Sequence, residues 1–357
     1  MKDSKTGELT ANFDIVLGVT PRGEAGACFQ DCREHSTMAK PTDWRSALMA
    51  IDPVTAKAPV TLHAAQLLMA RGLNAEAKTA ILEFLDWHRD HLQALRTLGA
   101  LLRRVGRWED AIAPLTRVAQ LESAGFTQQT TDQPQIMQFL AAAEGCSDAP
   151  RVAPAAFVTS LFDRTAPEFE SRLRGSLAYR GPELLRNAVD HVAGATAKNL
   201  DVLDIGCGTG LAGELFRGIA RRLDGVDLSP KMLAIAEAKG VYDGLTCGEI
   251  VAYLRATDHR YDLVVAADVL VYFGDLSPLI PALRGALRDP GWFAFTVEMA
   301  VDTDYVLQPV RRYAHSRDYL LRAAEPGGFT IRYLEEAAVR FEATQPVRSY
   351  VCVMATR

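Results

Sequence analysis

The feature that most constrains this chain is a glycine-rich turn that follows an apolar stretch. Residues 202–206 read Val-Leu-Asp-Ile-Gly, which predicts a buried strand, and glycine then recurs at 208 and 210. Residues 211–216 are typical of a helix start. Glycine permits backbone conformations closed to other residues and lets a ligand lie against bare main chain. Because a helix N-terminus presents unpaired N–H groups, we expect a ligand-binding turn between a strand and a helix.

Two acidic residues restrict the chemical class of ligand that this turn could bind. Asp204 precedes the first glycine, where a carboxylate would repel a pyrophosphate but attract an ammonium group. The spacing also differs from the G-x-G-x-x-G pattern of dinucleotide-binding proteins. Asp227 ends a second apolar stretch, about 20 residues after the turn, a position that suits hydrogen bonding to ribose hydroxyls. A ligand with a ribose and a cationic amino group but no diphosphate is indicated, and S-adenosylmethionine (SAM) fits that description.

Residues from about 157 to 357 resemble a class I SAM-dependent methyltransferase. The D-I-G-C-G-T-G sequence at 204–210 is similar to the first motif of that family, and V-D-L-S at 226–229 is similar to the second. Residues 262–270 and 291–298 resemble its fourth and fifth strands. The resemblance implies an α/β fold with a Rossmann-like seven-stranded sheet, SAM as cofactor, S-adenosyl-L-homocysteine as product and an enzyme of the EC 2.1.1 class.

Composition favours a cytoplasmic enzyme. The formal net charge of the 357 residues is −5, so no basic field attracts nucleic acid or an anionic membrane. The first residues lack the apolar core of a signal peptide, and no apolar run approaches the length of a membrane span. The six cysteines are scattered, which favours reduced thiols, and no acidic or cysteine constellation indicates a metal site.

The N-terminal half contains a helical repeat pattern. Gly72 and Gly106 lie 34 residues apart, as do Ala77 and Ala111. That period resembles tetratricopeptide (TPR) repeats, although a plain helical bundle fits as well. We therefore expect three parts: an extension at 1–58 that is poorly ordered or loosely docked, a TPR-like helical domain at 59–145, and a methyltransferase domain at 157–357. The order resembles a bacterial group of predicted methyltransferases with N-terminal TPR-like helices.

Within the last part we expect lid helices at 157–192 and a Rossmann-like core at 200–357. In the family such a lid closes over the cofactor, which makes Phe162, Tyr179 and Arg180 lid candidates. An arginine there could pair with the SAM carboxylate.

Further cofactor contacts are expected where the parallel strands end. Leu228 and Met232 would flank the adenine, Glu249 would approach its amino group, and Ile250 would pack on the ring. Asp268 and Val269 would line the reacting sulfonium and the acceptor channel. The complete set of expected cofactor contacts is Asp204, Gly206, Cys207, Gly208, Gly210, Asp227, Leu228, Met232, Glu249, Ile250, Asp268, Val269, Tyr179, Arg180 and Phe162.

Methyl transfer from a sulfonium is an in-line displacement that alignment and exclusion of water accelerate. A base is needed only for an acceptor that arrives protonated with a high pKa. The candidates are Tyr272, Tyr313 and His315, the last at the start of an expected helix at 317–324. The helix dipole would keep that histidine neutral.

Three functions are consistent with these sequence features. The first is methyl transfer to a small molecule at O, N or C. The second is a protein methyltransferase that recruits its substrate through the TPR-like helices, which could also mediate self-association. The third is a SAM-binding protein without transfer activity. Neither nucleic acid nor a membrane is an expected partner.

Overall fold

A computed structural model describes residues 44–49, 51, 62–126, 132–175, 177–194, 198–342 and 345–357. These residues divide into two compact units, one ending at Ala80 and the other running from Ile81 to Arg357. No helix in the described ranges has the length and apolar character needed to cross a membrane.

The first unit is helical. It contains α1 (Trp44–Met49), α3 (Leu62–Ala70) and the start of α4 (Asn74–Trp87). The main chain of Gly72 adopts a φ of +75° and ends α3, where the N–H of Leu73 returns to the carbonyl of Leu68. Glycine adopts this left-handed conformation without strain, which explains its place after the helix.

The second unit begins with helices that repeat this turn. Helices α5 (Leu92–Arg104) and α6 (Trp108–Phe126) are joined at Gly106, whose φ is +79°. Gly99 brings α5 close to α6, because a Cβ at that position would lie 2.4 Å from the Leu115 side chain. The glycines 34 residues apart therefore adopt the same conformation, while assignment of these helices to the TPR class remains a prediction.

Helix α7 (Gln133–Ala143) joins the helices to the sheet-containing part of this unit. Its Phe139 ring lies 4.9 Å from Phe157 of α8 (Ala155–Thr165) and 6.3 Å from Tyr313, measured between ring centroids. These side chains belong to one buried apolar cluster. Within the second compact unit, which starts at Ile81, α6 and α7 thus share a core with the residues that follow, and the domain bounds expected at 59–145 and 157–357 stay a prediction.

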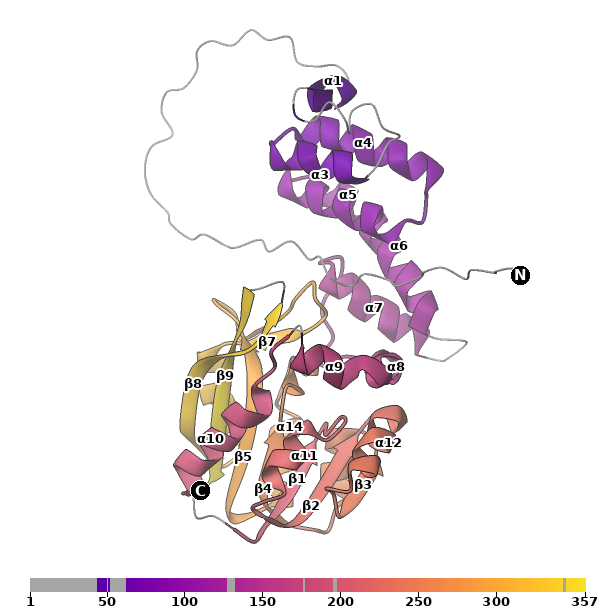
Figure 1. Cartoon of the computed structure of the whole chain (residues 1–357). Coiled ribbons are helices and arrows are strands. Elements are labelled where there is room, and N and C mark those ends of the chain that lie inside the picture. Colours follow the sequence, from indigo (N-terminus) through magenta and orange to yellow (C-terminus); the bar gives the residue numbers. More distant parts are fainter. Residues whose placement is uncertain are drawn as a thin grey trace, which may run out of the picture. The chain divides into compact units, whose positions relative to one another are not determined.

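One mixed sheet dominates the second unit (Figure 1). Strands β3, β2, β1, β4 and β5 are parallel neighbours in that order, β9 pairs antiparallel with β5, and β8 pairs antiparallel with β9. The short β7 pairs in parallel with the end of β5 and forms an antiparallel hairpin with β6. The strands are β1 (Leu200–Ile205), β2 (Ala220–Asp227), β3 (Gly244–Cys247), β4 (Tyr261–Ala266), β5 (Leu287–Met299), β6 (Tyr305–Leu307), β7 (Tyr313–His315), β8 (Phe329–Glu342) and β9 (Gln345–Thr356).

The mostly parallel Rossmann-like sheet is therefore confirmed. The described residues place nine strands in it rather than the seven expected, because the β6–β7 hairpin is inserted between β5 and the last helix.

Helices cover both faces of the sheet, as the apolar strands require. One face packs side chains of α13, α14 and α15, and the other packs side chains of α10 and α11. The remaining helices of the unit are η1 (Ala166–Glu168), α9 (Phe169–Arg174), α10 (Gly181–Ala193), α11 (Leu211–Phe216), α12 (Pro230–Lys239), α13 (Ile250–Ala256), η2 (Leu270–Tyr272), α14 (Leu279–Ala286) and α15 (Arg317–Ala324).

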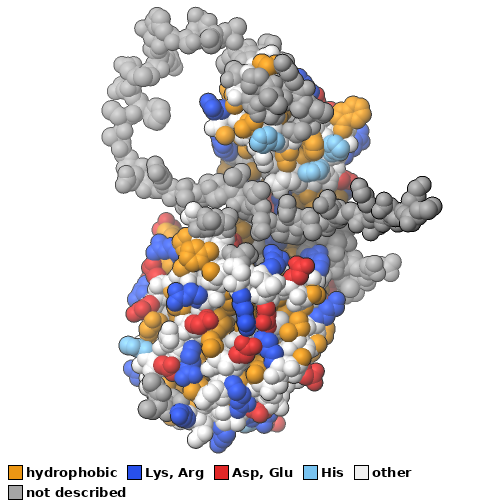
Figure 2. Space-filling model, viewed as in Figure 1, with side chains coloured by type: hydrophobic (Ala, Val, Ile, Leu, Met, Phe, Trp, Pro, Cys, Tyr) orange, Lys and Arg blue, Asp and Glu red, His pale blue; other side chains and the backbone are white. Residues whose placement is uncertain are grey.

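Acidic and basic side chains are interspersed over the sheet-containing unit on the face shown in Figure 2. That distribution agrees with the net charge of −5 and gives this face no broad basic field of the kind that binds nucleic acid.

Candidate functional site

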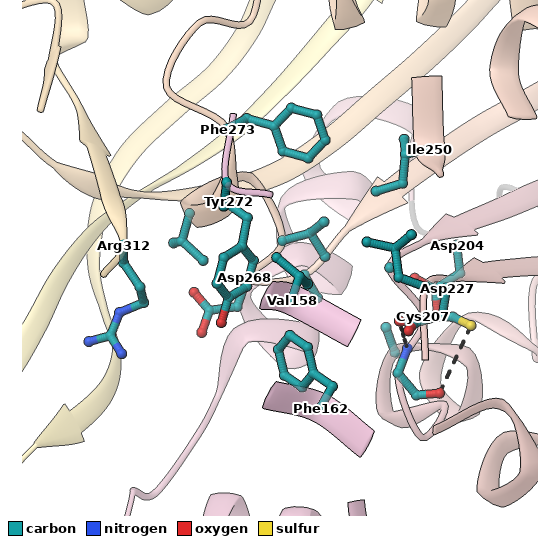
Figure 3. Close-up of a pocket in the computed structure, with 18 of the residues that line it drawn as sticks. Val158, Phe162, Asp204, Cys207, Asp227, Ile250, Asp268, Tyr272, Phe273 and Arg312 are labelled. Atoms are coloured by element: carbon teal, nitrogen blue, oxygen red, sulfur yellow. Dashed lines mark hydrogen bonds between the residues drawn. The ribbon is translucent and has the colours of Figure 1, made fainter. Parts of the chain in front are cut away.

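A cavity of about 550 Å³ opens where β1, β2 and β4 end, beneath α8 and α9. Figure 3 shows two polar groups of side chains in it, separated by apolar ones such as Val158 and Phe162. Asp204, Cys207 and Asp227 lie on one side, and Asp268, Tyr272 and Arg312 lie on the other. Such a size and mixture are typical of small-molecule sites.

The glycine turn forms the floor at the Asp227 side. Gly206 and Gly208 have φ values of +65° and +52°, which L-residues adopt only with strain. A Cβ on Gly206 would lie 2.5 Å from a methyl carbon of Val269, so only glycine fits without displacement. The turn thus exposes main chain to the cavity for both conformational and steric reasons.

Asp227 is tied to this turn through its carboxylate. One oxygen accepts the N–H of Gly208 at 2.9 Å, and the other accepts the N–H of Ser229 at 2.7 Å. Burial raises the pKa of Asp227, while these backbone donors act in the opposite direction. A carboxylate offers about four acceptor sites, so each oxygen can still accept a hydrogen bond from a ligand.

Asp204 lies behind the turn and is 1% exposed. Its Oδ2 accepts a hydrogen bond from the Tyr242 hydroxyl at 2.7 Å. Burial raises the pKa of Asp204 to about 7, and the nearby charge of Asp227 adds to that increase. Asp204 is therefore a carboxyl group that titrates near neutral pH, on which a cationic ligand group would favour the ionised form.

Glu249 begins α13 at the next strand end. Its two carboxylate oxygens accept the N–H groups of Val251 at 3.0 Å and Ala252 at 2.7 Å, which caps the helix. Glu249, Ile250 and Leu228 line the cavity together. The cap fixes the carboxylate at the helix start, beside the apolar Ile250 side chain.

Aromatic side chains from α8 and α9 cover the cavity. The Phe162 ring meets Phe169 edge-on at 5.8 Å and Tyr272 edge-on at 5.6 Å between centroids. On the same helix, Asp163 accepts the hydroxyl of Ser229 at 2.6 Å, which connects the cover to the start of α12. Tyr179 also lines the cavity. The expected lid region at 157–192 thus contributes Phe162 and Tyr179 to the wall.

The opposite polar side is built around Arg340 of β8, whose side chain is 3% exposed. Its guanidinium pairs with the carboxylates of Asp268 and Glu298, and its Nε lies 3.1 Å from Glu342. Burial lowers the pKa of Arg340, but the three carboxylates more than offset this and hold it above its ordinary value. Arg312 adds a second cation, 2.6 Å from Glu298 and 2.5 Å from Glu342.

Asp268 and Tyr272 bring this cluster to the cavity. Asp268 has a φ of +61°, and its N–H donates to the hydroxyl of Thr296 at 2.9 Å, which fixes the loop after β4. Burial raises the pKa of Tyr272 to about 12, and the charge of Arg312 lowers it in part. The phenol is therefore protonated at neutral pH and can donate a hydrogen bond.

His315 and Tyr313, expected as candidate bases, are placed elsewhere. Both are fully buried on β7 and absent from the cavity wall. The His315 Nε2 lies 3.0 Å from the carbonyl of Gly274, to which it donates, and burial lowers the pKa of His315 to about 4. The Tyr313 hydroxyl donates to the carbonyl of Pro150. Their side chains point into the apolar packing beneath the hairpin, because strand pairing with β5 and β6 sets that direction.

Three expected cofactor contacts also lie outside the wall. Gly210 ends the turn at a φ of +88° and precedes α11, and Met232 is fully buried in α12. Arg180 precedes α10 and is exposed, with its main-chain N–H donating to Val339. The other expected cofactor contacts and Tyr272 line the cavity together: Asp204, Gly206, Cys207, Gly208, Asp227, Leu228, Glu249, Ile250, Asp268, Val269, Tyr179 and Phe162.

Sequence reasoning missed Arg340, Glu298 and Glu342 at this site. Arg340 lies 42 residues from Glu298 and 72 residues from Asp268 along the chain, so no local motif contains the pairs. The available signal was an arginine within the apolar stretch of β8, which a buried strand tolerates only with a carboxylate partner.

Comparison with known proteins identifies part of this architecture. The family model of the methyltransferase domain matches residues 203–295, which include the glycine turn, β2 and β4. Residues 203–295 are thus similar to the methyltransferase domain of that family, which uses SAM as methyl donor.

Curated relatives match a similar region. A ubiquinone biosynthesis O-methyltransferase of Paraburkholderia phytofirmans is 26% identical over 152 residues, which cover 39% of this chain and 63% of the relative. One of a Methylobacterium species is 28% identical over 150 residues, which cover 37% and 60%. The chain therefore spans less than two thirds of the length of these relatives.

Among solved structures, the magnesium protoporphyrin IX methyltransferase of Synechocystis PCC 6803 aligns with a TM-score of 0.45 and 18% identity. The alignment covers 57% of this chain and 99% of that protein.

Proposed function

We propose that the protein is a SAM-dependent methyltransferase that transfers the methyl group to a small-molecule acceptor. The observation that carries this proposal is one cavity with two polar sides. The glycine turn with Asp204 and Asp227 forms one side, and Asp268, Tyr272 and Arg312 form the other. The family match over residues 203–295 supports it.

The residues at the first side fit SAM. The oxygens of Asp227 retain acceptor sites for two ribose hydroxyls after their bonds to Gly208 and Ser229. Gly206 carries no side chain and packs directly against Val269, so a ligand can lie against bare main chain at the turn. Asp204 would compensate the cationic amino group, while Glu249 and Ile250 would contact the adenine. Bound SAM supplies an electrophilic methyl group on a sulfonium.

The other residues contribute orientation and exclusion of water. Phe162 and Val158 form an apolar wall between the two polar sides. Holding donor and acceptor in line is worth up to roughly 7–11 kcal/mol of the barrier in well-oriented systems. Tyr272 is the group we assign to hydrogen bonding with the acceptor atom, because its hydroxyl remains protonated at neutral pH.

A small-molecule acceptor is favoured over recruitment of a protein through the helices. Helices α6 and α7 contribute Ala119, Ile136 and Phe139 to an apolar cluster that they share with α8 and β7. That surface is consequently used inside the compact unit. The acceptor class, the cytoplasmic location and any self-association through α3 to α6 are parts of the same proposal.

The first experiment is isothermal titration of the purified protein with SAM and with S-adenosylhomocysteine. Asp227→Ala is compared with Asp258→Ala, which changes an exposed aspartate in the loop before β4. Micromolar binding by the wild type and the Asp258 variant, lost in the Asp227 variant, is expected. Absence of binding by the folded wild-type protein would refute the proposal.

Methyl transfer is then measured with radiolabelled SAM against separate panels of phenols, amines, carboxylic acids and peptides. We expect label to be incorporated into a small molecule. In Tyr272→Phe, the rate of incorporation should fall while the affinity for SAM stays unchanged. Label in peptides alone would support the protein methyltransferase instead.

A further inference from the structure

A second cluster of buried charges lies outside the cavity, where α6 meets the β6–β7 hairpin. The Glu122 side chain of α6 is 9% exposed. One of its carboxylate oxygens lies 2.6 Å from Arg96 of α5, and the other lies 2.5 Å from Arg311 in the hairpin turn. The Arg311 side chain is itself only 15% exposed, so both partners of this ion pair are largely shielded from water, and salt weakens the pair little.

Arg311 sits in a tight turn that connects β6 and β7. Its N–H donates to the carbonyl of Gln308 at 2.8 Å, and the N–H of Gln308 donates to the carbonyl of Arg312 at 2.9 Å. Arg311 has a φ of +65°, a left-handed conformation that strains an L-residue, and its guanidinium is held by the charge-assisted bond to Glu122.

Two other residues of the turn, Gln308 and Arg312, contact the cavity cluster. The Gln308 side chain donates to Glu298 at 2.8 Å, and the Nε of Arg312 donates to the other oxygen of Glu298 at 2.6 Å. Arg312 also lines the cavity. Successive side chains of the turn therefore point in opposite directions, Arg311 toward α6 and Arg312 toward the cavity.

We propose that Glu122 is a positioning residue for the acceptor side of the cavity. By holding Arg311, it fixes the turn that places Arg312 between Glu298 and Glu342. This inference rests on the proposed function for its meaning, since Arg312 faces the side that we assign to the acceptor. Through Glu122 and Arg311, α6 would then help to position Arg312, a residue of the cavity wall.

The inference can be tested without an identified acceptor. In protein labelled with ¹⁵N-arginine, an Nε–H group bonded to a buried carboxylate exchanges slowly with water and gives a resolved signal. Arg312→Lys assigns the Arg312 signal by removing it. In Arg311→Met and in Glu122→Gln, we expect the exchange rate of the Arg312 Nε–H to rise about tenfold, the change that about 1.4 kcal/mol produces.

Two further variants separate positioning from a general loss of stability. Arg311→Lys retains the cation and is expected to restore slow exchange. Arg322→Met breaks an exposed ion pair with Asp304 just beyond the same hairpin and is expected to leave the Arg312 signal unchanged. If Arg311→Met does not fold, Glu122→Gln carries the test. An unchanged Arg312 exchange rate in a folded variant, or the same rise in Arg322→Met, would overturn the inference.

Titration with SAM distinguishes this outcome from failure of the proposed function. We expect Arg311→Met to bind SAM with wild-type affinity, because Glu122, Arg311 and Arg312 lie away from the glycine turn. If the wild type does not bind SAM, the proposed function fails, while the exchange measurement still decides whether Glu122 positions Arg312.

Discussion

Replacing Arg340 by methionine should destabilise the protein in a pH-dependent manner. Arg340 is 3% exposed and contacts Asp268, Glu298 and Glu342. Methionine retains most of the apolar stem and removes the charge. The substitution therefore isolates the electrostatic part of the cluster that Arg340 forms with these three carboxylates.

The expected magnitude follows from what remains after the change. Glu298 and Glu342 keep Arg312, at 2.6 Å and 2.5 Å, whereas Asp268 loses the arginine that pairs with it. Removing one partner of a buried ion pair costs about 3–5 kcal/mol, because it leaves an uncompensated charge. With two of the three carboxylates still paired, we expect the lower end, about 3 kcal/mol at pH 8.

The sign of the pH dependence is set by the carboxylates. In the wild type, Glu342 is partly desolvated, but Arg312 and Arg340 hold its pKa below the ordinary value. The resulting stabilisation is present above the unfolded pKa of about 4.5 and is lost as the pH falls through the folded value. Without Arg340, Glu342 keeps only Arg312 and binds a proton more readily, so the difference between variant and wild type should shrink from pH 8 to pH 5.

The assay is urea unfolding followed by circular dichroism at both pH values, with the free-energy difference taken from the shift in midpoint. The matched control is Arg348→Met on β9, where Arg348 is 66% exposed beside Glu336 and should contribute at most about 1 kcal/mol. A loss for Arg340→Met no larger than that of the control, or one independent of pH, would refute the reasoning.

Three other predictions concern individual residues of the site and its surroundings. Gly206→Ala should lower SAM affinity at least tenfold in titration calorimetry, because a φ of +65° and the 2.5 Å approach to Val269 leave no room for a Cβ; unchanged affinity would contradict this role of the turn. Asp204, with a pKa of about 7, contributes stability below its unfolded pKa of 3.8 that is lost as the pH rises through 7, so thermal melts of Asp204→Asn should vary less between pH 4 and 7. His315, with a pKa of about 4, contributes stability above 6.5 that is lost as the pH falls toward 4; His315→Gln should remove this acid sensitivity in melts and leave SAM binding intact. A loss of SAM binding in that variant would place His315 in the site after all.

The sequence was most informative where the chemistry is contiguous. The alternation of Gly206, Gly208 and Gly210 predicts a turn because each glycine permits a local conformation, and all three adopt positive φ values. Asp227 follows from the same reasoning, since a parallel neighbour of β1 ends at the same edge of the sheet.

His315 shows a side-chain direction that the local sequence does not predict. A histidine before a predicted helix is consistent with a base, and the helix does begin at Arg317. The direction of its side chain depends on pairing of β7 with β5 and β6, which turns the imidazole into the packing under the hairpin. Strand pairing between distant segments is a tertiary property, so the local sequence does not contain it.

Local sequence was sufficient to predict the mostly parallel α/β fold, the glycine turn and the acids beside it, because these depend on backbone freedom and on which ends of strands meet. The other side of the cavity follows only from how distant segments pack together. Arg340, Glu298 and Asp268 come from β8, β5 and the loop after β4, and Glu122 reaches the same region through Arg311. Buried charges require partners, but which residues become partners depends on how the strands are ordered in the sheet.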